Sequence, residues 1–144
     1  MPAERTKTRR PHRVPLPEAA INVLRELKAL GSPGEYLFPS IRTWKKAISD
    51  ATFTAALRRM GFTGEEMTAH GFRASFSTIA NESGLWNPDA IERALAHIES
   101  NAVRAAYARG DYWEERVQMA QWWAELLEGL RSGAPKSAGA VGAR

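Results

Sequence analysis

Apolar residues return at helical spacing over most of this chain. From Glu18 onward they occupy every third position, at Ile21, Leu24, Leu27 and Leu30. Because a helix has about 3.6 residues per turn, these positions share one face. Glycine and proline at positions 31–34 end the pattern. The spacing therefore predicts a helix from Glu18 to about Leu30.

Capping residues mark two further helices. Asp50 is the expected N-cap of a helix that passes through Phe53 and Leu57 and has Gly61 at its C′ position. Thr68 is the expected N-cap of the next helix, over 69–82, which Gly84 ends.

The second half of the chain predicts three more helices. Asn-Pro-Asp at 87–89 places a capping residue, proline and a carboxylate where a helix should begin, and this helix ends near His97. A short helix capped by Ser100 or Asn101 and a long one over 111–130 follow. The long helix carries an apolar stripe at Trp113, Val117, Ala120, Ala124 and Leu127, widened by Trp122, Trp123, Leu126 and Leu130.

Strand signals are sparse by comparison. Residues 36–39 are apolar and fit an extended segment or a buried loop. Residues 4–10 fit the turn of a hairpin and residues 11–16 its second strand, with the beginning of the first strand missing. The predicted fold class is mainly α: a bundle of about five to six helices with a short, truncated N-terminal β-hairpin. Residues 1–131 form the expected domain, and the Gly/Ala/Ser-rich residues 132–144 a disordered tail.

Charge is distributed unevenly along the 144 residues. Residues 1–46 hold 10 Lys/Arg against 4 Asp/Glu, and residues 47–144 hold 10 against 12, which gives the net charge of +4. A basic segment attracts polyanions, although a solvated basic face without a partner explains the charge about as well. There is no cysteine, and no apolar run approaches the length of a spanning helix. These features favour a cytoplasmic protein.

The sequence His70-Gly71-Phe72-Arg73 combines two anion-binding side chains at the start of a predicted helix. Positions i and i+3 share a face, so the imidazole and the guanidinium project together where the helix N-terminus favours an anion. Phe72 is expected to anchor the helix in the core. By itself the pair fits an ordinary surface His/Arg pair better than a phosphate site.

Two further residues have chemistry to offer. His97 ends the apolar run Leu95-Ala96, a position that a helix-dipole partner or a core histidine also explains. Tyr107 follows two alanines, so little bulk surrounds its phenol and a large substrate could approach. A core tyrosine is the simpler reading when the residue is taken alone.

Taken together these residues are more specific. Lys7, His70, Arg73, His97 and Tyr107 follow the order and rough spacing of the active site of tyrosine recombinases. The flanking segments resemble phage-type integrases, especially those of prophages and integrative islands, over about residues 2–130. These segments are AERTKTRRPHRVPL, LFPS, ISDATFTAALRRMGF, TAHGFRASFSTIANESG, WNPDAIERALAH and NAVRAAYARGDYWEERVQMAQWWAELL.

The resemblance implies a role for each residue and the catalytic-core fold of DNA breaking-rejoining enzymes. Tyr107 would attack a scissile phosphate to give a 3′-phosphotyrosine and a free 5′-hydroxyl. Arg73 would hold the non-bridging oxygens, and Lys7 would protonate the leaving 5′ oxygen. His70 and His97 would hydrogen-bond the phosphate, with His70 also a candidate for proton transfer.

Partners follow from the same resemblance. Double-stranded DNA at attachment sites is the implied substrate, in the bacterial cytoplasm at the nucleoid, with no cofactor, no metal and no membrane. The remaining basic side chains of the N-terminal segment would contact the DNA backbone: Arg5, Arg9, Arg10 and Arg13. The long last helix would mediate self-association on DNA, although packing on the chain's own core explains it equally well.

One departure from the family pattern is evident. Family members carry another catalytic arginine upstream of the hairpin, together with a DNA-gripping domain, and neither is found in these 144 residues. The expectation is a C-terminal catalytic fragment with little activity of its own. The alternative is a non-catalytic DNA-binding or self-associating module derived from an integrase.

Overall fold

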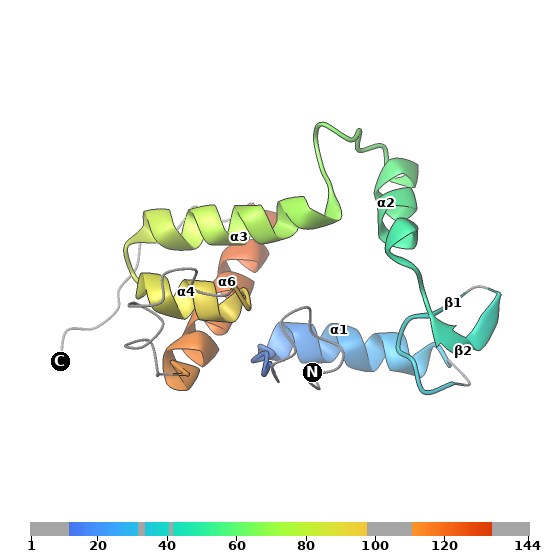
Figure 1. Cartoon of the computed structure of the whole chain (residues 1–144), viewed down its shortest axis with the longest axis horizontal. Helices are drawn as coiled ribbons and strands as arrows, with labels where there is room; N and C mark the ends of the chain where they lie inside the picture. Colours follow the sequence, from blue (N-terminus) through green and yellow to red (C-terminus); the bar gives the residue numbers. More distant parts are fainter. Residues whose placement is uncertain (1–11, 32–33, 41, 98–110, 134–144) are drawn as a thin grey trace.

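Helices dominate the computed structural model, which describes residues 12–31, 34–40, 42–97 and 111–133 (Figure 1). Five helices and a two-stranded antiparallel hairpin are seen in these ranges, which confirms the mainly α fold. The elements in chain order are α1 (Glu18–Ala29), β1 (Pro39–Ser40), β2 (Thr43–Ala47), α2 (Asp50–Arg59), α3 (Ala69–Ser83), α4 (Pro88–Ala94) and α6 (Trp113–Ser132).

The helix ends agree closely with the capping signals. The Thr68 hydroxyl accepts a hydrogen bond from the Gly71 amide at 3.1 Å at the start of α3, and Asn87 Oδ1 accepts from the Asp89 amide at 2.9 Å at the start of α4. Gly61 and Gly84 both have positive φ, at 96° and 65°, as residues that follow a helix often do.

The N-cap of α2 is one residue away from its predicted position. Ser49 has the extended backbone of an N-cap, and Asp50 is the first helical residue. Asp50 therefore lies in the first turn, where its carboxylate still complements the positive end of the helix dipole.

The β-hairpin of the described residues lies at 39–47, where the sequence did not predict one. Pro39 pairs with Ala47, with an irregularity in register between Pro39 and Ser40. The Phe38 and Phe53 rings, with centroids 6.4 Å apart, connect the hairpin region to α2. Residues 12–16 form no strand, contrary to the predicted second strand, because no neighbouring segment in the described part of the chain pairs with them.

The core lies where α3, α4 and α6 meet, on the side of the molecule away from α2 and the hairpin (Figure 1). Its buried residues are Ala80, Ala90, Ile91, Leu95 and Met119. Alanine at two of these positions lets the helices approach closely, while Ile91 and Met119 fill the space between them.

Aromatic rings surround this core. Phe76 meets Trp123 edge to face at a centroid distance of 5.3 Å, and Trp86 meets Trp122 at 5.7 Å. Phe76, one turn further along α3, takes the place predicted for Phe72, which is 54% exposed. The prediction that Phe72 anchors α3 in the core was therefore wrong.

The buried face of α6 differs from its predicted apolar stripe. Arg116 and Met119 are the buried residues of this helix, whereas Val117 and Leu127 are 42% and 46% exposed. α6 packs against α4, so the face turned toward Ile91 is set by this contact and not by the apolar residues of α6 alone.

Several expected features lie outside the described residues. The predicted short helix around Tyr107 falls within 98–110, and most of the predicted tail falls within 134–144. Among the helices that the structure does describe, none has the length and hydropathy needed to span a membrane.

Candidate functional site

The first turn of α3 presents His70 and Arg73 to solvent. Thr68 caps this turn through the Gly71 amide, which fixes the direction in which the helix begins. His70 and Arg73 are separated by three positions and therefore lie on the same face. Both are exposed, so an anion approaching the α3 N-terminus can reach the two side chains together.

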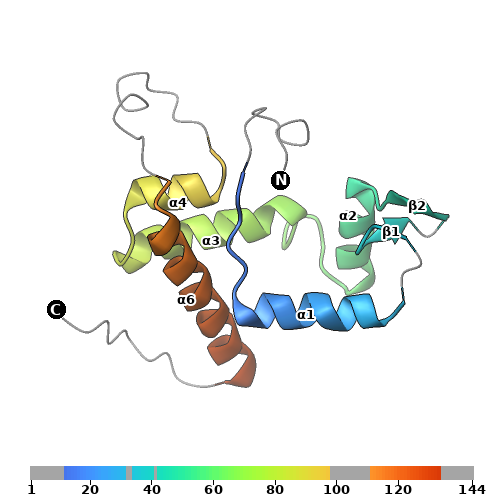
Figure 2. The same ribbon diagram turned by 90° about the horizontal axis from the view of Figure 1, so that it is seen from below.

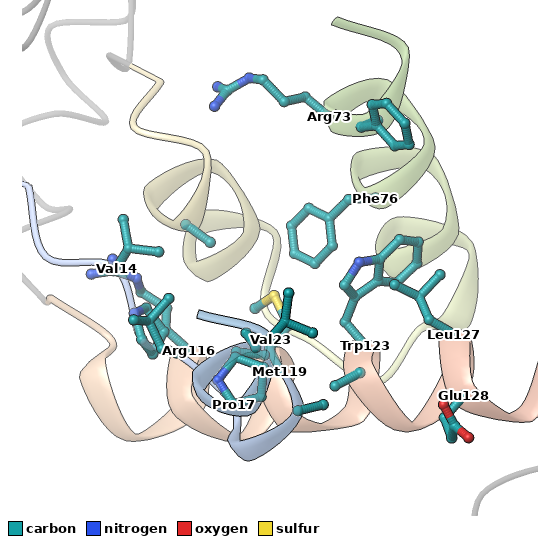
Figure 3. Close-up of a pocket in the computed structure, with 18 of the residues that line it drawn as sticks. Val14, Pro17, Val23, Arg73, Phe76, Arg116, Met119, Trp123, Leu127 and Glu128 are labelled. Carbon is teal, nitrogen blue, oxygen red and sulfur yellow. The ribbon is translucent and has the colours of Figure 1, made fainter. Parts of the chain in front are cut away.

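Arg73 also connects α3 to the end of α4. Its Nη2 donates a hydrogen bond to the main-chain oxygen of Leu95 at 2.5 Å. Figure 3 shows the side chain extending from α3 away from Phe76. Since Arg has five N–H donors in a planar fork, one bond to Leu95 leaves others that can bind two phosphate oxygens.

The chain reverses direction immediately after Leu95 and so places His97. Ala96 has φ 55°, in the left-handed region that a non-glycine residue seldom adopts. The Ala96 amide donates to Arg93 O at 3.1 Å, and the His97 amide donates to Glu92 O at 3.0 Å. These two bonds form a Schellman motif, which returns His97 to a position beside Glu92.

The His97 imidazole is held by a carboxylate. Its Nδ1 lies 2.7 Å from Glu92 Oε2, with both side chains about half exposed. The Glu92 carboxylate accepts a hydrogen bond from Nδ1–H, so this contact fixes the orientation of the ring, with Nε2 on the side of the ring away from Glu92. Glu92 therefore orients the histidine.

The loop that leads into α3 is organised by Arg58 of α2. Its Nη1 donates to three main-chain oxygens, those of Phe62 at 2.7 Å, Thr63 at 2.8 Å and Met67 at 3.1 Å. Met67 directly precedes Thr68, so Arg58 fixes the path of the chain into the α3 N-cap. Glu66 closes the same loop by accepting from the Thr63 amide at 2.7 Å, and this bond lowers the pKa of the Glu66 carboxyl.

A cavity of about 720 Å³ lies between α1, α3, α6 and the segment 14–17 (Figure 3). Its walls are mainly apolar side chains, such as Val23, Phe76 and Leu127. Arg73 and Arg116 also line it. An apolar space of this kind suits hydrocarbon groups and gives a phosphate little to bind. The α3–α4 corner, formed by His70 and Arg73 of α3 with Leu95 and His97 after α4, has side chains better suited to an anion.

Some of the predicted site residues lie in the described part of the chain and others do not. Arg73 and His97 are brought to the same corner by the bond from Arg73 to Leu95, and His70 shares the α3 face of Arg73. The Arg13 guanidinium stacks over the Trp113 ring, 3.9 Å from its centroid. The remaining predicted residues lie outside the described part of the chain: Lys7, Tyr107, Arg5, Arg9 and Arg10.

Three residues of this region were not found from the sequence. Glu92 and Leu95 read as ordinary residues of α4, since the turn that brings His97 back to Glu92 depends on the unusual φ of Ala96. Arg116 reads as a solvent-facing residue of a long helix, yet it is 2% exposed. No group of three or more His, Asp or Glu side chains suited to a metal ion occurs among the described residues.

The known proteins that this chain resembles include several integrases. The chain is 44% identical over 133 residues to the prophage integrase IntA of Escherichia coli (strain K12), a match that covers 92% of this chain and 32% of that protein. It is 44% identical over 124 residues to the integrase of Enterobacteria phage P4, covering 85% and 28%. It is 37% identical over 123 residues to the integrase of Shigella phage Sf6, covering 85% and 31%.

The chain thus spans about a third of the length of these relatives. No solved structure matches it significantly. The sequence profile described as "Phage integrase family" matches residues 2–114, most of the chain and all the predicted site residues. The chain belongs to the phage integrase family.

Proposed function

We propose that this chain carries the catalytic residues of a site-specific recombinase, which cuts and rejoins double-stranded DNA through a 3′-phosphotyrosine. The names of its relatives, among them the integrases of phages P4 and Sf6, support integration as the biological setting. Tyr107 is the proposed nucleophile, Arg73, His70 and His97 bind the scissile phosphate, and Lys7 is the proposed general acid.

The observation that carries this proposal is the α3–α4 corner. Arg73 binds Leu95 O at 2.5 Å, and the Schellman turn that follows places His97 two residues further on, against Glu92. The guanidinium is thus joined to a residue two positions before the oriented imidazole in the sequence. This combination suits a phosphodiester, because each group favours negative charge on the non-bridging oxygens.

The proposed chemistry is a reversible phosphoryl transfer. The Tyr107 phenolic oxygen attacks phosphorus, a phosphotyrosyl bond forms, and the bond from phosphorus to the 5′ oxygen breaks. Lys7 supplies a proton to that leaving oxygen, and Arg73 stabilises the charge that builds up on the phosphate. Because the phosphodiester is exchanged for a phosphotyrosyl ester, the strand can be rejoined without a nucleotide cofactor.

The activity of the chain by itself is expected to be low. The resemblance to tyrosine recombinases assigns no residue of this chain to the family's upstream catalytic arginine, and loss of one such contact typically costs about 100- to 1000-fold in rate. Activity should therefore be measured both with this chain and with the product of any open reading frame that continues upstream of its first codon.

A covalent adduct is the decisive test. The protein is incubated with a library of random-sequence DNA duplexes, each nicked so that a short cleaved strand diffuses away and traps the intermediate. We expect an adduct that survives denaturation with the wild-type chain and none with Tyr107→Phe, which should still shift DNA in a native gel. Absence of any adduct with the wild-type and upstream-extended proteins would contradict the proposal.

A self-associating or DNA-binding module without catalysis is the second candidate function. It is favoured by the apolar side chains that α6 leaves exposed, Val117 at 42%, Leu127 at 46% and Leu130 at 56%. Light scattering over a concentration series tests it directly. A monomer at high concentration, with and without DNA, would rule out self-association, and DNA binding without an adduct would favour the non-catalytic module.

A further inference from the structure

Arg116 is the one charged residue found buried among the described residues, and its guanidinium contacts two segments that are distant in sequence. Nη1 binds Asp111 through the carboxylate at 2.9 Å and through the main-chain oxygen at 3.2 Å. Nη2 donates to the main-chain oxygen of Arg13, a residue 103 positions away in the sequence. A single guanidinium thus connects the start of α6 to the segment that precedes α1.

The ring of Trp113 adds a second connection between the same two parts of the chain. The Arg13 guanidinium lies 3.9 Å from the Trp113 ring centroid, and that of Arg116 lies 5.6 Å from it. Cations over an indole face are attracted by its quadrupole. We call these four residues, Arg13, Asp111, Trp113 and Arg116, the arginine clasp.

The clasp lies beside the α3–α4 corner. The His12 side chain lies against the backbone of Ala94, and Ala94 directly precedes Leu95, the partner of Arg73. Figure 2 shows residues 12–17 running past the end of α4 toward α1. The segment held by Arg116 therefore passes the end of α4, where Arg73 binds Leu95.

The two segments joined by the clasp are close in sequence to the proposed general acid and the proposed nucleophile. Lys7 precedes Arg13 by six residues, and Tyr107 precedes Asp111 by four. We propose that Arg116 is a positioning residue, which holds Arg13 and Asp111 in a fixed relation to each other and so sets the points from which the chain continues to the general acid Lys7 and to the nucleophile Tyr107. This inference rests on the proposed function and extends it to a residue that touches neither DNA nor the reacting atoms.

Arginine is suited to this position by its geometry. The planar fork reaches the Arg13 carbonyl on one side and Asp111 on the other at the same time, whereas the single ammonium of a lysine cannot span both. Burial lowers the pKa of Arg116 while Asp111 opposes that shift. Its Nε is buried without a hydrogen-bond partner among the described residues, a cost that packing alone would not require.

The first experiment measures position without requiring catalysis. Because the chain has no cysteine, Val14→Cys and Glu114→Cys place two spin labels at exposed positions, each one residue away from a member of the clasp. We expect a narrow distance distribution between the labels in the otherwise wild-type protein and a broad one after Arg116→Met. Arg131→Met is the matched control, since Arg131 lies on the same helix but is 78% exposed and pairs only with Glu128 in the described residues.

The second experiment measures single-turnover cleavage at saturating DNA. Misplacement of reacting groups by about 1 Å costs on the order of 100-fold, so Arg116→Met and Arg116→Lys should each cleave about 10- to 100-fold more slowly than wild type. DNA affinity should remain unchanged. Arg131→Met should cleave at the wild-type rate, and cooperative melting curves should show that all three variants are folded.

A sulfur substrate identifies which catalyst has moved. A 5′-bridging phosphorothiolate leaves as a thiolate, which needs no general acid because thiols are far more acidic than alcohols. The part of the Arg116→Met defect that comes from a displaced Lys7 should disappear on this substrate, as it should for Lys7→Ala. The part that remains measures displacement of Tyr107.

Two results would overturn the inference: an unchanged spin-label distribution in Arg116→Met, or wild-type cleavage by that variant. The absence of a covalent adduct with the wild-type protein would instead contradict the proposed function. In that case the spin-label distances still decide whether Arg116 fixes the two segments.

Discussion

Arg73 of α3 donates a hydrogen bond to the main-chain oxygen of Leu95 at the end of α4, at a distance of 2.5 Å. The guanidinium proposed to bind DNA phosphate is therefore attached to the turn that carries His97. Because Leu95 is itself buried in the core, this bond fixes the corner relative to the interior of the molecule. A side chain fixed in this way loses less conformational entropy when it binds substrate.

Replacing Arg73 with lysine tests the importance of the guanidinium fork. Lysine keeps the charge but cannot bind Leu95 and two phosphate oxygens together. We expect Arg73→Lys to reduce DNA cleavage by about 100-fold or more and to lower the free energy of unfolding by about 1 kcal/mol at most. Adduct yields and urea titrations measure the two effects. Cleavage at the wild-type rate would contradict the role of Arg73.

Glu92→Gln tests whether the carboxylate orients His97. The pair is half exposed, so the free energy of unfolding should change by less than about 1 kcal/mol. Cleavage should fall about tenfold, the rate equivalent of one hydrogen bond. Glu125→Gln, an exposed glutamate of α6 that contacts Gln121, is the matched control. Equal rates for the two variants would show that Glu92 does not act through His97.

Ala96→Gly tests the strain in the turn before His97. The left-handed region costs an L-residue about 1–2 kcal/mol, whereas glycine adopts it freely. Since Ala96 has φ 55°, its replacement with glycine should stabilise the protein by up to about 1 kcal/mol. This value allows for the entropy that glycine adds to the unfolded chain, which opposes the gain. Thermal or urea unfolding measures the change. A loss of stability would mean that the turn is relaxed with alanine.

Thr68→Ala tests the cap that begins α3. The hydroxyl of Thr68 accepts from the Gly71 amide at 3.1 Å, and loss of such a cap costs about 1 kcal/mol. Ser49→Ala is a matched control, since Ser49 is the N-cap of α2 but its side chain makes no capping hydrogen bond. We expect urea titrations to show a larger loss for Thr68→Ala than for Ser49→Ala.

His12 should make stability depend on pH. Burial, and then the charge of Arg116, lower the pKa of His12 from its usual 6.5. The unfolded chain therefore binds the His12 proton more readily than the folded chain, so this stabilisation is complete above about pH 6.5 and is lost as the pH falls. Melting temperatures should decrease less between about pH 7.5 and 5.5 for His12→Gln than for wild type. His70→Gln and His97→Gln serve as controls, and an unchanged profile for His12→Gln would contradict the assignment.

The helix boundaries could be predicted because their causes are local. Thr68, Gly84 and the Asn87-Pro88 pair act through their own backbone and that of residues a few positions away. These signals do not depend on what the helix packs against. The order of the basic and aromatic residues was also sufficient to indicate the family, which the match over residues 2–114 establishes.

Which side chains are buried could not be predicted from the same pattern. Arg116 is buried and Val117 half exposed, the reverse of what their polarity suggests. The contact with α4 decides which face of α6 is buried, and the main-chain oxygen of Arg13 compensates the Arg116 guanidinium. Both depend on residues distant in sequence, so no local pattern reports them.

The sequence by itself determined the five helices of the described residues, the caps at Thr68 and Asn87 and the side chains predicted to bind phosphate, since these follow from short-range geometry and side-chain chemistry. Only the tertiary structure decided that Arg73 reaches Leu95, that His97 returns to Glu92, and that Arg116 joins segments 103 residues apart. These contacts exist because packing α3, α4 and α6 around Ile91 brings their ends together, and buried polar groups then require partners.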